Sequence, residues 1–294
     1  MNLSEAQIEF VSYLKEQKRS ESTITAYSKD IQQLSDFLEK IIKVLEVDLI
    51  TTEHLNNFVN TIKSDKKNNY TLKTVSRKIN SMKTFFKFLF SNQKTKTDPA
   101  TSVNHPKYKI SPPRVLTRLE YRALRDVART NIRLYTIVEI LLQTGVRIGE
   151  LARLTLGDLK IDGNRKYLNI SAYGSNTRRS VEINEVALAA IKNYLQIRPQ
   201  SNDKVESLFV TKTGNSLLVR NIRTSISRAF EKAGIKSATV NDIRNTFIVH
   251  QLKNGMSSEI IGEIVGHKRL TSTKKYLQFI KDKPTRKSTK IIPL

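Results

Sequence analysis

The sequence contains no cysteine, so disulfide bonds and thiolate metal sites are excluded and a reducing compartment is expected. It also contains no run of about 18 apolar residues, the length that a membrane-spanning helix needs. The first 16 residues carry acidic side chains and lack the apolar core of a signal peptide. We therefore expect neither a membrane span nor a secretory leader, and a cytoplasmic location.

Acidic residues are scarce relative to basic ones. Asp and Glu total 27 against 51 Lys and Arg, which gives a formal net charge of +24. This excess is far larger than solubility requires and indicates a polyanionic partner. Nucleic acid is the leading candidate, because each phosphate that a cation neutralises releases condensed counterions. The alternative is a generally lysine-rich proteome.

Histidine is also rare, and the four histidines are His54, His105, His250 and His267. No two of them have metal-ligand spacing beside a carboxylate cluster, so a metal-dependent nuclease is disfavoured. A Walker-type glycine loop is absent as well. The sequence therefore predicts no metal, no ATP and no other cofactor.

The first part of the chain has helical periodicity. Apolar residues recur at steps of three and four at Ile24, Tyr27, Ile31, Leu34, Leu38 and Ile41. Asp30 lies off this stripe and is expected to face water. Chain length favours two domains rather than one.

A second helix is predicted from Thr71 to Phe90. Its inward residues are Val75, Ile79, Met82, Phe86 and Leu89. Lys73, Arg77 and Lys78 lie on other faces and are candidates for contacts with a DNA backbone. The alternative is an ordinary solvated helix surface.

Four segments are predicted along the chain. They are a helical domain at 1–105, a basic and proline-punctuated linker at 106–115, a second domain at 116–280, and a tail at 281–294. Thr117 and Glu120 have the spacing of a capping box that begins the second domain. The basic tail ends in apolar residues, and Ile291 and Leu294 are expected to pack on a neighbouring protomer.

The fold class predicted for the chain is mainly α with a small antiparallel β-sheet. An apolar helix over 134–142 stops at Gly145, and residues 166–172 and 178–183 alternate like two strands around Gly174. Helices are predicted to resume near Asn184 and Val219, with a strand-like segment over 208–210. The last helices bracket Gly255 and Gly266.

Three polar clusters interrupt the apolar pattern of the second domain. The first is Thr-Gly-Val-Arg-Ile-Gly-Glu-Leu at 144–151, the second is Asn-Asp-Ile-Arg-Asn-Thr-Phe at 241–247, and the third is Gly266-His267 followed by Tyr276 nine residues later. Arg147 and Arg244 could converge on one phosphate. Guanidinium suits this role because its planar fork makes two charge-assisted hydrogen bonds to phosphate oxygens.

These clusters resemble the signature boxes of the tyrosine recombinase, or phage integrase, family. Residues 144–151 match the first box throughout, and Val265-Gly266-His267 with Tyr276 matches the third. The second box has Asn241 and Asn245 where histidines are usual. Size and architecture most resemble Xer recombinases and compact transposon integrases.

The resemblance implies a helical core-binding (SAM-like) domain followed by a tyrosine recombinase catalytic domain. It makes Arg147 and Arg244 the phosphate clamp, His267 a hydrogen-bond donor and Tyr276 the nucleophile of a 3′-phosphotyrosyl intermediate. Asn241 takes the place of a catalytic histidine, and Glu150 orients its neighbours. Arg178 and Arg179 are further candidates for DNA contacts.

One family feature is missing from this sequence. The family places a general-acid lysine in the turn that corresponds here to residues 172–179, and the alignment puts Tyr173 or Gly174 at that position. Lys166 and Arg178 are the nearest cations, but neither is predicted to replace it.

Three functions remain open at this point: an active recombinase, a non-catalytic DNA-binding protein of recombinase descent, and a topoisomerase that uses the same nucleophile. For the recombinase we expect double-stranded DNA with inverted repeats, a homotetramer or heterotetramer on two duplexes, and a nucleoid-associated location. Chromosome-dimer resolution and mobile-element integration are both compatible with the sequence.

Overall fold

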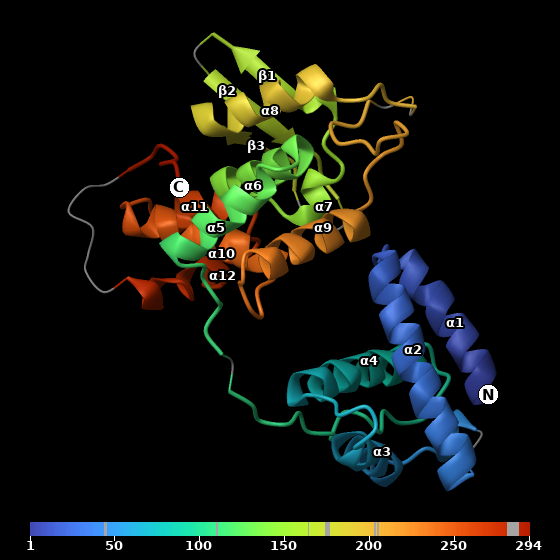
Figure 1. Cartoon of the computed structure of the whole chain (residues 1–294). Coiled ribbons are helices and arrows are strands. Elements are labelled where there is room, and N and C mark those ends of the chain that lie inside the picture. The colour runs from blue at the N-terminus through green and yellow to red at the C-terminus, as the bar shows by residue number, and fades with distance from the viewer. Residues whose placement is uncertain are drawn as a thin grey trace. The chain divides into compact units, whose positions relative to one another are not determined.

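The computed structural model describes residues 1–43, 46–109, 111–163, 165–173, 177–202, 204, 206–280 and 288–294. The chain divides into two compact units, Met1–Ile110 and Ser111–Leu294 (Figure 1). This boundary lies inside the linker predicted over 106–115. Each unit has its own core.

The first unit is helical. Its α-helices are α1 (Leu3–Glu16), α2 (Glu21–Phe37), α3 (Thr52–Ser64) and α4 (Leu72–Ser91). Side chains of Asn2, Ser20, Thr51 and Thr71 cap their first turns, where backbone N–H groups lack helical partners. The predicted apolar residues of α4 are all buried. On the first predicted stripe Ile31, Leu34 and Leu38 are buried, whereas the Ile41 side chain lies outside the described residues.

The outward orientation predicted for Asp30 and Lys78 is wrong. Asp30 is 4% exposed and Lys78 is 7% exposed, and Lys78 Nζ lies 3.0 Å from Asp30 Oδ1. Ser81 and Arg77 also donate to the Asp30 carboxylate. Burial of these charges is tolerated because each finds a partner on the facing helix. Lys73 is exposed, and the Arg77 side chain is 44% exposed despite its ion pair.

The second unit combines helices with one small sheet. Its helices are α5 (Arg118–Ala128), α6 (Ile132–Thr144), α7 (Ile148–Leu151), α8 (Glu185–Ile197), α9 (Val219–Lys232), α10 (Val240–Lys253), α11 (Ser258–Val265) and α12 (Thr271–Lys274). The capping box of Thr117 and Glu120 begins α5 as predicted.

The sheet has three antiparallel strands in the order β1 (Leu159–Asp162), β2 (Arg165–Ile170) and β3 (Arg179–Glu182). The two predicted strands are β2 and β3, and β1 was not predicted. Gly174, the predicted centre of their connection, lies outside the described residues. The predicted strand at 208–210 is wrong, because Val210 forms only an isolated bridge to Ser216.

Helices α6 and α10 form the centre of this unit. Every residue of α6 from Thr136 to Thr144 is buried, and α10 is buried over almost its whole circumference. The two helices pack against each other, and α6 also packs against α8. A helix surrounded on all sides holds its polar side chains rigidly, since each buried polar group needs a fixed partner.

The end of the chain packs on its own unit. Ile291 and Leu294 contact the core, the main chain of Ile292 exchanges two hydrogen bonds with the Gln251 amide, and Leu294 N donates to Gln143 Oε1 at 3.1 Å. In a single chain the apolar tail is therefore docked in place. Residues 281–287 of the predicted tail lie outside the described residues.

Candidate active site

Arg147 is placed by a glycine turn. Helix α6 ends at Gly145, which adopts a left-handed conformation with φ of +61°, and Arg147 then precedes α7. Its Nη1 donates to Glu150 Oε1 at 3.1 Å and to Val265 O at 3.2 Å, and its Nη2 donates to Gly266 O at 2.9 Å. The guanidinium thus lies at the C-terminal end of α11.

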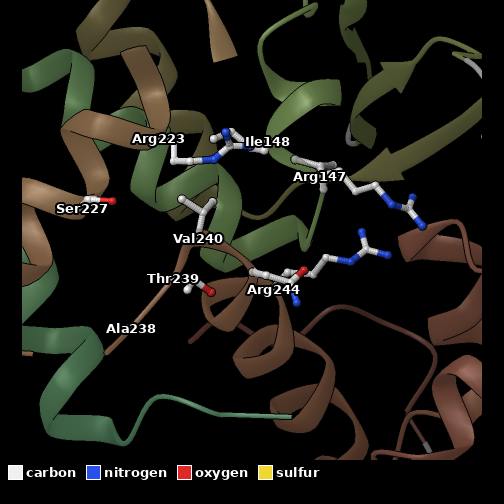
Figure 2. Close-up of a pocket in the computed structure, with 10 residues that line it drawn as sticks. Arg147, Ile148, Arg223, Ser227, Ala238, Thr239, Val240 and Arg244 are labelled. Atoms are coloured by element: carbon white, nitrogen blue, oxygen red, sulfur yellow. The ribbon is translucent and has the colours of Figure 1, made fainter. Parts of the chain in front are cut away.

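Arg244 reaches the same point from α10. It is 6% exposed and donates to Gly145 O at 2.5 Å and to Val265 O at 2.6 Å. Two guanidinium groups from distant parts of the chain therefore meet at the Val265 carbonyl oxygen, as Figure 2 shows for their side chains. Burial lowers the pKa of Arg244 to about 9, and the positive charge of Arg147 acts in the same direction.

Phe247, in α10, packs that helix against the turn at Gly145. A Cβ atom at Gly145 would lie 2.4 Å from Phe247 Cδ1, so only glycine lets the ring pack on the turn. Thr246 Oγ1 accepts from Leu116 N at 2.8 Å. The polar cluster at 241–247 therefore provides the catalytic candidates Asn241 and Arg244 and two residues, Thr246 and Phe247, that fix their helix in place.

Glu150 is a buried carboxylate shared by two arginines. Arg179 Nη1 and Nη2 donate to its two oxygens at 3.0 and 2.8 Å, and Arg147 donates through both its main-chain N and Nη1. Burial alone raises the pKa of Glu150, but the hydrogen bonds and charges of Arg179 and Arg147 outweigh it and hold this pKa below its ordinary value. The predicted orienting position of Glu150 fits this geometry.

Arg179 was predicted to contact DNA, but in this structure its guanidinium is bound within its own unit. Its side chain is 9% exposed, its two Nη atoms donate to Glu150 and its Nε donates to Ile264 O at 2.7 Å. The β3 strand thus uses Arg179 to brace Glu150. Arg178, in contrast, is exposed.

His267 follows the left-handed Gly266, which ends α11. The Gly266 φ of +67° favours glycine, and a Cβ atom there would also lie 2.8 Å from Arg179 Nη1. His267 Nδ1 lies 2.8 Å from Thr273 Oγ1. Burial lowers the pKa of His267 to about 4, reinforced by the charges of Arg244 and Arg147. The ring is therefore neutral at physiological pH and can donate one N–H.

Tyr276 is buried at 3% exposure and packs in a cluster with Phe247 and Val265. Its hydroxyl donates to Asn245 Oδ1 at 2.7 Å. Burial raises the pKa of Tyr276, and the charge of Arg244 opposes this effect. The phenol is thus protonated and engaged in this structure.

A cavity of about 440 Å³ lies beside the two clamp arginines. Its lining includes Arg147, Arg244 and Asn241, with Arg223 entering from α9 (Figure 2). Asn241 is exposed in the first turn of α10, whereas Tyr276 does not line this cavity. Arg223 was not predicted as a site residue, because it lies in no polar cluster and is exposed on α9.

The position of the missing family lysine is also informative. Tyr173 is exposed, and the guanidinium carbon of Arg153 lies 3.5 Å from the centre of its ring. Lys166 is paired with Glu185. Burial lowers the pKa of Arg153. Arg153 is therefore a cation next to Tyr173, and it was not predicted as a site residue.

Within the described residues, no group of three or more His, Cys, Asp or Glu side chains could hold a metal ion. The helices in the described part of the chain also include none that is long and apolar enough to cross a membrane.

Comparisons with known proteins give one consistent result. The tyrosine recombinase XerC of Leptospira interrogans serogroup Icterohaemorrhagiae serovar copenhageni is 28% identical over 290 residues, covering 96% of this chain and 91% of that protein. The crystal structure of XerA recombinase matches with a TM-score of 0.52 at 26% identity, covering 93% of each chain. A lambda integrase dimer bound to a COC' core site has the same fold, with a TM-score of 0.75 at 17% identity over 92% of this chain and 97% of that one.

Family models match both units of the chain. Residues 8–93 match the phage integrase N-terminal SAM-like domain, and residues 114–282, more than half of the chain, match the phage integrase family. With the two arginines, the histidine and the tyrosine at their expected positions in sequence, the protein belongs to the phage integrase family.

Proposed function

We propose that this protein is a site-specific DNA recombinase that cleaves and rejoins strands through a covalent bond between Tyr276 and a 3′-phosphate. The observation that supports this most strongly is the meeting of Arg147 and Arg244 at one oxygen atom. Two like charges held this close repel each other, and a phosphate anion between them relieves that repulsion. The pair is therefore suited to bind a phosphodiester.

The reaction needs no external energy source. The Tyr276 phenol gives its proton to water and its oxygen attacks phosphorus, while the bond from phosphorus to the 5′ oxygen breaks. The 5′ oxygen takes up a proton from water and leaves as a hydroxyl. Negative charge grows on the non-bridging oxygens, and the preorganised guanidinium groups of Arg147 and Arg244 stabilise it, with His267 as a further N–H donor. A second 5′-hydroxyl then attacks the phosphotyrosine and reseals the strand.

The class of substrate follows from the net charge of the protein. A net charge of +24 favours double-stranded DNA, and exposed basic side chains such as Lys73 and Arg178 are available for its backbone. We extend the proposal to inverted-repeat sites, to a tetramer on two duplexes, and to a cytoplasmic, nucleoid-associated location. In that assembly the apolar end at Ile291 and Leu294 leaves its own unit and binds the same residues on a neighbour.

A nicked duplex that loses a short fragment after cleavage tests the catalytic step, because it traps the covalent protein–DNA complex. Wild type is expected to accumulate this complex and Tyr276→Phe is not. Arg147→Lys keeps the charge but loses the fork, and we expect cleavage about 100-fold slower or worse. Salt-sensitive binding without a covalent product in wild type would instead favour a non-catalytic DNA-binding protein, and relaxation of plasmids without a defined site would favour a topoisomerase.

A further inference from the structure

Tyr276, the proposed nucleophile, is buried in this structure and is not accessible to a substrate. Tyr276 is 3% exposed, its ring packs against apolar side chains such as Phe247, and its hydroxyl donates to Asn245 Oδ1 at 2.7 Å. A phenol whose hydroxyl is hydrogen-bonded to a buried amide cannot reach a phosphorus atom. Cleavage therefore has to be preceded by loss of this hydrogen bond.

The Asn245 amide is fixed in the orientation that accepts from Tyr276. Its Nδ2 donates to Arg114 O at 2.9 Å and to Asp242 Oδ1 at 3.2 Å, which uses both of its protons. The oxygen of the amide is then left for the phenol. Because Asn245 is buried, reversing the amide would leave several polar groups without partners.

Asn245 also directs the phenol to a different side of α10 from the clamp. Consecutive residues of a helix project about 100° apart, so Asn245 projects from a different face of α10 than Arg244. Arg244 binds the carbonyls of Gly145 and Val265, whereas Asn245 binds the Arg114 carbonyl. The hydrogen bond to Asn245 thus holds the Tyr276 hydroxyl against a different face of α10 from the one that carries Arg244.

We propose that Asn245 is a positioning residue that holds the Tyr276 phenol in a stored state, from which the phenol is released before it attacks DNA. This inference rests on the proposed function of Tyr276 as the nucleophile. Its anchor lies at the start of the second unit, because Arg114 O binds Asn245 and Leu116 N binds the adjacent Thr246. Displacement of residues 114–116 on DNA binding would loosen the Asn245 amide and release the phenol.

Two substitutions remove Asn245 Oδ1, the atom that accepts from the Tyr276 hydroxyl. Asn245→Leu keeps a side chain of similar volume, and Asn245→Ala replaces it with a smaller one. Asn254→Leu is the matched control at the C-terminal cap of the same helix, where Nδ2 donates to His250 O at 2.7 Å and to no other described residue. All are compared with wild type as full-length protein.

The first measurement is nitration of the DNA-free protein by tetranitromethane, mapped by peptide mass spectrometry. We expect Tyr276 to react about five-fold faster in an Asn245 variant, the factor that loss of one hydrogen bond gives. Tyr194, which is buried in the same unit and accepts from Val210 N, reports on general loosening and should not change. The Asn254→Leu protein should behave like wild type.

The second measurement is the single-turnover rate of covalent complex formation on the nicked duplex. If release precedes attack, this rate rises by about the same factor as nitration, since both follow one opening equilibrium. The proposal is rejected if neither Asn245 variant exposes Tyr276 while Tyr194 stays protected, or if cleavage is unchanged or slower. Absence of covalent complex in every protein, wild type included, would instead reject the proposed function, and the nitration result would still decide the stored state.

Discussion

Glu150 is the residue on which the geometry of the clamp depends. Its carboxylate binds the guanidinium groups of Arg147 and Arg179 and the main-chain N–H of Arg147. A buried carboxylate with four donors restricts each donor to one position. Arg147 is therefore aimed by Glu150, and Glu150 is in turn fixed from the sheet by Arg179.

Glu150→Gln tests this role. The amide cannot balance two buried guanidinium charges, so we expect the variant to lose about 3 kcal/mol of unfolding free energy at pH 7. Urea denaturation measures this difference. Cleavage should slow as well, because Arg147 loses its orientation.

The pH dependence of the same variant gives a second check. The pKa of Glu150 lies below its ordinary value of 4.5 in the folded protein, so the stabilisation is present above about pH 4.5 and is lost as pH falls through the folded pKa. The difference between wild type and Glu150→Gln should thus be full at pH 7 and shrink below pH 4.5. A difference that grows on acidification would contradict the assignment.

The sequence predicted the family and the order of the site residues, because their spacing is a local property. It did not predict partners that come from distant segments. Asp30 and Lys78 were expected in water, yet they are 48 residues apart and neutralise each other in the core. In the same way, Asn245 was noted only as a departure from the family, since its bond to Tyr276 depends on the packing of α10.

Among the elements, the turn between α6 and α7 connects the two arginine segments. Gly145 has a positive φ, its carbonyl accepts from Arg244, and its missing side chain leaves room for Phe247. Three features of the polar clusters at 144–151 and 241–247 thus meet at one backbone position.

Gly145→Ala should destabilise the protein more than an equivalent change elsewhere. Left-handed backbone costs about 1 kcal/mol for alanine, and the clash with Phe247 adds about 2 kcal/mol. Gly234→Ala is the matched control, because Gly234 also has a positive φ of 69° but nothing lies within 4 Å of the added Cβ. Thermal unfolding of both variants checks this, and equal losses would mean that the ring contact is unimportant.

Most helices of the second unit were predictable from periodicity and caps. Examples are α8, which Asn184 caps at its start, and α11, which Gly266 caps at its end. Strand β1 was not predicted, because only Leu159 of its four residues is even partly buried. The segment at 208–210 looked like a strand because it is apolar, but it is buried as a loop. A short apolar run predicts that a segment is buried, but it does not predict whether the segment forms a strand or a loop.

For the whole molecule, the proposed tetramer gives the docked end of the chain a second use. Ile292 and Leu294 are bound by the buried amides of Gln251 and Gln143, and Arg125 donates to Leu294 O at 3.0 Å. In the proposed assembly the same side chains bind this peptide from an identical neighbour.

Removal of residues 291–294 separates DNA binding from assembly, because this segment carries no basic or acidic side chain. We expect binding of one protomer to a single site to change by less than about three-fold, since phosphate contacts dominate it. Pairing of two duplexes should weaken about ten-fold or more, because every interface loses its linking peptide. Gel-shift titration and sedimentation analysis measure the two steps, and unchanged pairing would show that the tail stays on its own unit.

The identity of the residue joined to DNA tests the central claim most directly. After reaction with the nicked duplex, the protein is digested and the DNA-linked peptide is sequenced by mass spectrometry. We expect a single linkage through the Tyr276 oxygen to a 3′-phosphate, formed by wild type and strongly reduced in Arg147→Lys and Arg244→Lys. A linkage at another residue, or a yield that does not depend on either arginine, would contradict the account.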